Sequence, residues 1–89
     1  MPMDRYQEMT VYCAVVEEHG FASAARRLGL SAPAVTRAVA ALEERIGARL
    51  LIRGARSIRL TESGQQFHED CRRILAELDR SKRVDVAAV

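Results

Sequence analysis

The sequence predicts a mainly α-helical fold with one two-stranded β-hairpin. Four segments repeat apolar residues with a helical period, a short glycine-containing turn separates the second from the third, and one stretch alternates polar and apolar residues. The 89 residues provide room for one modest core. We expect three helices and the hairpin within residues 1–60, a long linker helix over 61–83 and a flexible tail over 84–89.

The first helix is expected to run from about Asp4 to Glu18. Asp4 suits the positive end of the helix dipole, and Gly20 is expected to end the helix. Phe21 follows as a core anchor between the first and third helices. The apolar stripe of this helix comprises Met9, Tyr12, Cys13 and Val16.

A short second helix, about Ser23 to Leu28, is followed by Gly29, which supplies the positive φ of a sharp turn. Ser31 then has the features of an N-cap. Its hydroxyl can accept a hydrogen bond from the amide of Ala34, because the intervening Pro33 has no N–H. The buried stripe of the third helix comprises Val35, Val39, Leu42 and Ile46.

The opposite face of the third helix carries small or basic residues near its start and acidic residues later. A tight two-helix unit of this kind places its second helix where side chains can enter a DNA major groove. We expect this end to insert into DNA, with Arg37 reaching a guanine edge or a phosphate. The residues expected at the DNA surface are Ala32, Pro33, Thr36 and Arg37.

After Gly47 the period changes from helical to alternating. Residues 50–52 are apolar, residues 53–56 form a basic turn, and residues 57–60 alternate as a half-buried strand does. We interpret this stretch as a hairpin, or wing, with Arg53 and Arg56 at its tip. Arginine suits the narrow, electronegative minor groove beside an occupied major groove.

Thr61 is expected to cap a final helix over about Glu62 to Lys82. Its apolar residues recur at alternating spacings of four and three, which indicates a heptad seam that pairs with a second copy of the chain. The alternative is a single amphipathic helix packed on its own domain. The residues expected at the dimer seam are Phe67, Cys71, Ile74, Leu75 and Leu78.

Positive charge is concentrated in the segment with the two-helix signal. Residues 23–60 hold eight arginines against Glu43 and Glu44, whereas the flanking segments 1–22 and 61–89 are both net acidic. Such segregation favours a polyanion-binding face, because neutralising phosphates releases condensed counterions. A merely solvated basic surface is the alternative.

Other classes of function have little support in the sequence. Cys13 and Cys71 lie far apart and are expected to be reduced thiols, although a disulfide switch is possible; His19 and His68 are expected to be solvated. We expect no metal, no cofactor and no catalytic activity, since no nucleophile–base pair or phosphate loop is present. We also expect no membrane association and a cytoplasmic location, because no apolar segment or signal peptide is present.

The order of helix, helix-turn-helix, wing and long helix resembles the N-terminal winged helix-turn-helix domain of LysR-type transcriptional regulators. The resemblance covers about Met3 to Arg83 and is carried by FASAARRLGLSAPAVTRAVAALEERIGARLLIR followed by RLTESG. It implies a sequence-specific duplex-DNA-binding domain that dimerises through the linker helix on a partly palindromic operator. It also implies a C-terminal effector-binding domain, absent from this chain, which we therefore interpret as a piece of a longer protein rather than a stand-alone domain.

The resemblance assigns roles to individual positions. Ala32, Pro33, Thr36 and Arg37 match base- and phosphate-contacting positions, and Ser31 matches a cap that touches a phosphate. The wing positions near the minor groove are Arg53, Arg56 and Ser57. A small-molecule effector would bind only the absent domain, and a tetramer is possible for the full-length protein.

The chain departs from the family pattern at three places. Many members have Gln at the position of Ala32, so a base preference does not transfer there. Thr-Thr is common within the wing where this chain has RGAR, and a Ser or Thr often stands in place of Ala22.

A protein-interaction module is the second hypothesis for function, and titration with random-sequence duplex DNA would distinguish it from a DNA-binding domain.

Overall fold

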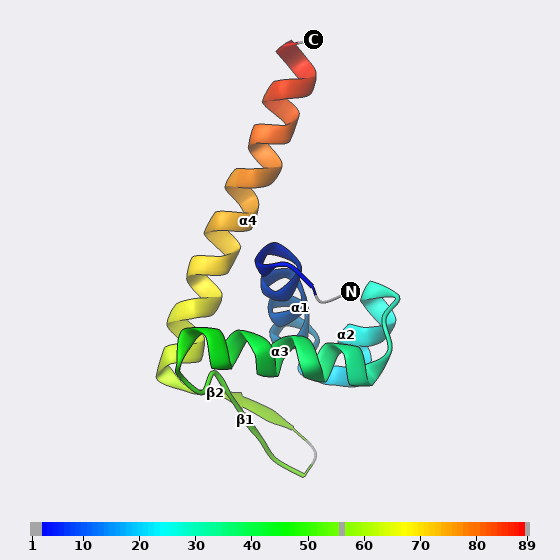
Figure 1. Cartoon of the computed structure of the whole chain (residues 1–89), viewed down its shortest axis with the longest axis vertical. Helices are drawn as coiled ribbons and strands as arrows, with labels where there is room; N and C mark the ends of the chain where they lie inside the picture. Colours follow the sequence, from blue (N-terminus) through cyan, green and yellow to red (C-terminus); the bar gives the residue numbers. More distant parts are fainter. Residues whose placement is uncertain (1–2, 56, 89) are drawn as a thin grey trace.

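In the residues that this computed structural model describes, 3–55 and 57–88, four helices and one hairpin follow one another in the predicted order (Figure 1). The mainly α-helical, winged architecture is therefore confirmed. The elements are α1 (Arg5–Glu18), α2 (Phe21–Leu28), α3 (Ala32–Ile46), β1 (Leu51–Arg53), β2 (Ile58–Leu60) and α4 (Glu62–Ala88).

Helix α1 lies at the centre of the domain and contacts α2, α3 and α4. A reciprocal capping box starts it: the Gln7 amide donates to Asp4 Oδ1 at 2.8 Å, and the Asp4 amide donates to Gln7 Oε1 at 3.0 Å. The sequence predicts a single apolar stripe, but the structure buries residues 11–15 without a break. The difference arises because three neighbouring helices cover α1 on several sides, whereas one stripe suffices for a surface helix.

The turn between α1 and α2 corrects two predicted boundaries. The left-handed residue that ends α1 is His19, with φ of 58°, and not Gly20, whose backbone is extended. Helix α2 begins at Phe21, two residues earlier than predicted, and no side chain caps it. The amides of His19 and Gly20 donate to Val16 and Val15, so α1 closes one residue before the glycine.

The core lies between α1, α3 and the roots of the hairpin and α4. Its largest fully buried side chains are Tyr12, Val15, Val35, Leu42, Leu50 and Cys71. Val35, Val39 and Leu42 of the predicted α3 stripe are buried, but Ile46 is 40% exposed. Ile46 is the last residue of α3 and lines an open groove with Ala48 and Phe67 instead of facing α1.

Helix α4 projects from the domain on the side opposite the wing, which gives the molecule extents of 49 × 27 × 23 Å (Figure 1). It continues to Ala88, through the stretch from residue 84 for which the sequence predicts a tail. No helix within the described residues combines the length and apolarity needed to cross a bilayer.

Candidate nucleic-acid interface

The start of α3 is an exposed ridge held by local hydrogen bonds. Gly29 turns the chain with φ of 69°, and Leu30 N donates to Ala25 O at 2.9 Å. Ser31 Oγ then accepts from the Ala34 amide at 3.2 Å, as the sequence predicts. Pro33 occupies the first turn, where amides have no helical partner. A preformed turn and cap thus present this end of α3 to solvent.

The predicted DNA-contacting residues of α3 lie together on this ridge. Ser31, Ala32, Pro33 and Arg37 are exposed, and Thr36 is half-buried. Within the described residues the Arg37 guanidinium forms no ion pair. Small side chains let a helix approach base edges closely, while an unpaired arginine offers donors to a guanine or a phosphate.

The wing lies beside α3 and is a short antiparallel ladder. Leu51 pairs with Leu60, Ile52 with Arg59, and Arg53 with Ile58. The Gly54 amide donates to Ser57 O at 2.7 Å and closes the turn. Arg53 therefore ends β1 and does not lie at the tip itself, while Ser57 is exposed in the turn. Arg56, the other predicted tip residue, lies outside the described residues.

An acidic residue fixes the root of the wing to α3. The amides of Leu50 and Leu51 donate to Glu43 Oε2 at 2.7 and 3.2 Å. The sequence predicts Glu43 only as an acid remote from DNA, so this anchor is not predicted. The available signal was its position next to Leu42 in the buried stripe, which puts its carboxylate at the edge of the core.

Two arginines of the basic segment are neutralised by α1. Arg27 Nη1 donates a hydrogen bond to Glu17 Oε1 at 2.8 Å, and this bond raises the pKa of Arg27. Arg45 Nη2 lies 3.0 Å from Glu8 Oε2, and Glu8 is buried. The pairing of Glu8 with Arg45 is not predicted from the sequence. Glu8 precedes Val11, Tyr12 and Val15 at helical spacing, which was a usable sign of burial.

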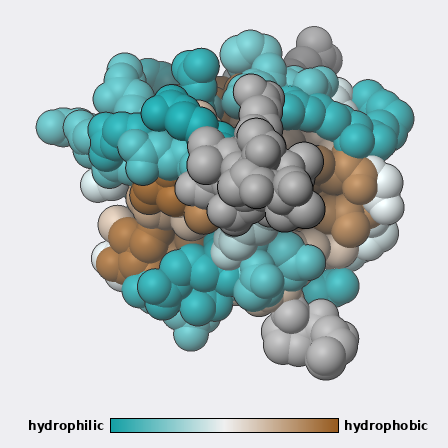
Figure 2. Space-filling model, turned by 90° about the horizontal axis from the view of Figure 1, so that it is seen from above, coloured by the Kyte–Doolittle hydropathy of each residue, from teal (hydrophilic) through white to brown (hydrophobic). Residues whose placement is uncertain are grey.

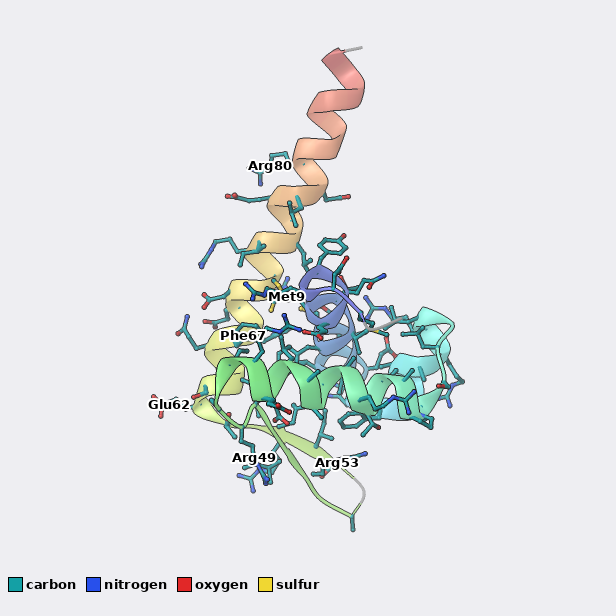
Figure 3. All side chains as sticks on the ribbon, viewed as in Figure 1. Met9, Arg49, Arg53, Glu62, Phe67 and Arg80 are labelled. Carbon is teal, nitrogen blue, oxygen red and sulfur yellow. The ribbon has the colours of Figure 1, made fainter. Side chains whose placement is uncertain are left out.

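Two further arginines of this segment lie on the side of α3 that bears the wing (Figure 3). Arg49 and Arg53 both lie below α3 on this side, away from Arg80 on α4 (Figure 3). Arg53 also contacts α2, because its guanidinium carbon is 4.1 Å from the centre of the Phe21 ring. Within the described part of segment 23–60, the arginines without an ion pair are Arg26, Arg37, Arg49, Arg53 and Arg59.

The joint between the wing and α4 is tightly packed. Thr61 Oγ1 accepts from the Gly64 amide at 2.9 Å, which confirms the predicted cap, and donates to Arg49 O at 2.6 Å. The Tyr12 hydroxyl donates to Gly64 O at 2.7 Å. A Cβ at Gly64 would collide with the carbonyl of Leu50. The glycine of the TESG sequence is therefore required by close approach of α4 to the wing root.

The predicted dimer seam divides into a buried and an exposed part. Cys71 is fully buried inside its own protomer, and the Phe67 ring packs 5.7 Å from that of Tyr12. Leu75 also packs against the core. All three contact their own protomer because the first half of α4 lies against α1, but Phe67 and Leu75 are only partly buried, so their part in a dimer stays a prediction. Ile74 and Leu78 are 45% and 42% exposed and stay available to a partner.

Tyr12, Cys13 and Cys71 are buried near this joint. Burial, more than the neighbouring cysteines and Glu43, raises the pKa of Tyr12. Both thiols are free and buried, as the sequence predicts. A hydrogen bond between them lowers the pKa of Cys13 and raises that of Cys71, which burial raises further. Their inaccessibility makes them structural, and the described residues contain no group of side chains placed to hold a metal ion.

Known structures share this arrangement of ridge, wing and projecting helix. The CbnR_DBD–DNA complex aligns with a TM-score of 0.90 and 42% identity, over 97% of this chain and 98% of that chain. The BenM_DBD/catB site 1 DNA complex aligns with the same TM-score and 30% identity, over 96% and 93% of the two chains.

Sequence comparison gives the same relationship. TfdT of Cupriavidus pinatubonensis, an HTH-type transcriptional regulator, is 43% identical over 82 residues, which are 92% of this chain and 36% of TfdT. AaeR of Escherichia coli, an HTH-type transcriptional activator, is 41% identical over 76 residues, which are 85% of this chain and 25% of AaeR. The chain thus spans roughly a third or less of these relatives. Residues 6–65 match the model described as "Bacterial regulatory helix-turn-helix protein, lysR family". With its fold, its arginine-bearing wing and this match in agreement, the chain belongs to the lysR family of bacterial regulatory helix-turn-helix proteins.

Proposed function

We propose that this chain is the duplex-DNA-binding part of a transcriptional regulator. The observation that carries the proposal is the exposed, capped start of α3 beside a hairpin whose arginine is unpaired by any described acid. The α3 ridge would enter the major groove, and the wing would lie over the adjacent minor groove. The two similar solved structures are DNA complexes, which supports duplex-DNA binding by this chain.

The residues of the ridge and the wing have different tasks in this proposal. Ala32, Pro33 and Thr36 touch base edges or thymine methyl groups, and Arg37 reads a guanine or holds a phosphate. Ser31 contacts a phosphate beside the start of the helix, where the dipole favours negative charge. Contacts to the DNA backbone come from the wing residues Arg53, Arg56 and Ser57.

We propose that α4 pairs two copies of the chain through Ile74 and Leu78. These apolar residues are four positions apart, so they share a face of the helix and can bury each other's surface in a dimer. Viewed along α4 from its C-terminal end, the molecule shows apolar patches among hydrophilic surface (Figure 2). Ile74→Glu should shift the sedimentation mass from dimer to monomer; an unchanged mass would remove this seam.

The whole protein would regulate transcription from a partly palindromic operator in the cytoplasm. The chain spans only part of its relatives' length. We therefore propose that the whole protein also has an effector-binding domain that binds a small molecule, and that the full-length form can be a tetramer. A binding role without catalysis agrees with the names of the relatives, which are transcriptional regulators.

Selection of bound sequences from a random duplex pool tests the proposal directly. A single enriched, partly symmetric motif is expected. Fluorescence anisotropy on that motif should give a log Kd that depends on log salt, with a slope of magnitude about 5 for a dimer with three phosphate-contacting arginines per protomer. No enrichment together with a slope near zero would reject DNA binding.

A further inference from the structure

The contact between Arg53 and Phe21 joins the wing to the helix-turn-helix. Arg53 is the last residue of β1 and is exposed, whereas Phe21 is the first residue of α2 and packs partly against the core. The guanidinium carbon lies 4.1 Å from the ring centre, well within the range of a cation–π interaction. From the sequence, Phe21 is predicted as a core anchor and Arg53 as a wing-tip residue, with no link between the two.

We propose that Phe21 is a positioning residue for DNA binding, whose ring holds the Arg53 guanidinium ready for the DNA backbone. This inference rests on the proposed function, because it needs Arg53 to meet a phosphate. It assigns Phe21 an effect on affinity through Arg53, in addition to its packing in the core.

The chemistry of arginine makes this arrangement effective. A guanidinium is planar, so one face can rest on an aromatic ring while its in-plane N–H groups stay open to a phosphate. An arginine that is free in solution must lose rotamer freedom when it binds DNA. The ring contact restricts the side chain before DNA arrives, so less of that loss remains to oppose binding.

The contact also complements the anchor at the other end of the same strand. Glu43 of α3 binds the amides of Leu50 and Leu51 at the wing root, and Phe21 holds the outer end of β1. A strand of three residues fixed at both ends keeps a set position relative to α3. The distance between the two DNA-contacting elements would therefore depend on an aromatic ring that itself never touches DNA.

Phe21→Leu tests the proposal, because leucine keeps apolar bulk but has no π face. Measured by anisotropy, this variant should bind both the selected operator and random duplex about two- to fivefold more weakly, with their ratio unchanged. Phe21→Tyr, which keeps the ring, should bind as the wild type does. In an Arg53→Ala background, Phe21→Leu should have no further effect on Kd.

Site-specific replacement of Phe21 by 3,4,5-trifluorophenylalanine keeps the test valid if leucine disturbs folding. The ring keeps its shape but attracts a cation less, so affinity should fall while the melting temperature stays constant. Wild-type affinity in the fluorinated variant, or an equal Phe21→Leu effect with and without Arg53, would overturn the inference. Absence of any duplex binding by the wild type would instead reject the proposed function, and the inference with it.

Discussion

The two ends of α3 use similar residue types for opposite purposes. At the N-terminal end, Ser31 and Arg37 are exposed, and Arg37 has no ion pair within the described residues. At the C-terminal end, Glu43 binds two amides of the wing root and Arg45 pairs with the buried Glu8. One end is therefore free to contact a ligand, while the other fastens α3 to its neighbours. The number of arginines in the segment does not distinguish these two roles. They depend on whether an acidic side chain of a neighbouring element lies close enough to pair with the arginine.

Replacing the arginine at the fastened end should cause the largest loss of folding stability at neutral pH. Arg45→Ala leaves the carboxylate of Glu8, which is 3% exposed, without its cation, and should lower the free energy of unfolding by about 2 kcal/mol. Arg45 itself is 42% exposed, so solvent screens part of the pair. Urea denaturation measures the loss. Adding Glu8→Gln should recover most of it, and a loss below about 0.5 kcal/mol would show that the pair is not structural.

Replacing Arg37, at the free end, by alanine should weaken DNA binding without changing the free energy of unfolding. Arg37→Ala should weaken operator binding by about 1–3 kcal/mol and relax the preference at one base pair if the guanidinium reads a guanine. Its urea midpoint should stay at the wild-type value, since no described acid pairs with Arg37. Anisotropy with a panel of single-base operator variants measures both effects. A uniform loss on every duplex would reassign Arg37 to a phosphate.

Comparing substitutions at the neighbouring residues Glu43 and Glu44 distinguishes the anchoring role of Glu43 from the effect of its charge alone. Glu43→Gln keeps an acceptor oxygen but loses the charge that strengthens the two hydrogen bonds from the backbone amides. The free energy of unfolding should therefore fall by about 1 kcal/mol. Every duplex should be bound somewhat more weakly, because the wing root is less firmly held. Glu44→Gln, on the exposed side of α3, is the matched control and should change neither property. Equal effects of the two variants would contradict the anchoring role of Glu43.

The last predicted effect is absent near neutral pH and appears only in alkaline solution. Burial raises the pKa of Tyr12 above its usual value of about 10 in the folded chain. The folded state therefore retains this proton at a pH where the unfolded chain has lost it. Stability should be unaffected by Tyr12 below pH 10 and should then fall by up to about 1.4 kcal/mol per pH unit from this group. Tyr12→Phe should remove that part of the slope; an unchanged slope would contradict the prediction.

The sequence predicted most of the fold because its signals were local. The Ser31 cap, the Gly29 turn, the alternation of residues 57–60 and the Thr61 cap each follow from neighbouring residues, and the structure contains all of them. Boundaries failed where the signal was ambiguous. Gly20 suggested the end of α1, yet the left-handed residue is His19, which closes α1 one position earlier.

The contacts that hold the candidate interface together could not be predicted in the same way. The pairs Glu8–Arg45 and Phe21–Arg53 join residues more than thirty positions apart, so no local spacing reports them. The heptad spacing of α4 indicated an apolar stripe but not what covers it. Packing of α4 against α1 buries Cys71 and leaves Ile74 exposed. The role of each ridge and wing residue toward DNA stays a prediction, and the substitutions above address it at Arg37 and Arg53.

The close approach at Gly64 also bears on the geometry of a complete regulator. Tyr12, Thr61 and Gly64 set the direction in which α4 leaves the domain, and a helix of its length extends for about 40 Å. A tilt of roughly 10° at that junction would displace the far end by about 7 Å, about two base-pair steps of B-DNA. The half-site spacing that a dimer accepts would thus depend on the absence of a side chain at Gly64. A larger residue at this position should change the preferred half-site spacing before it abolishes DNA binding.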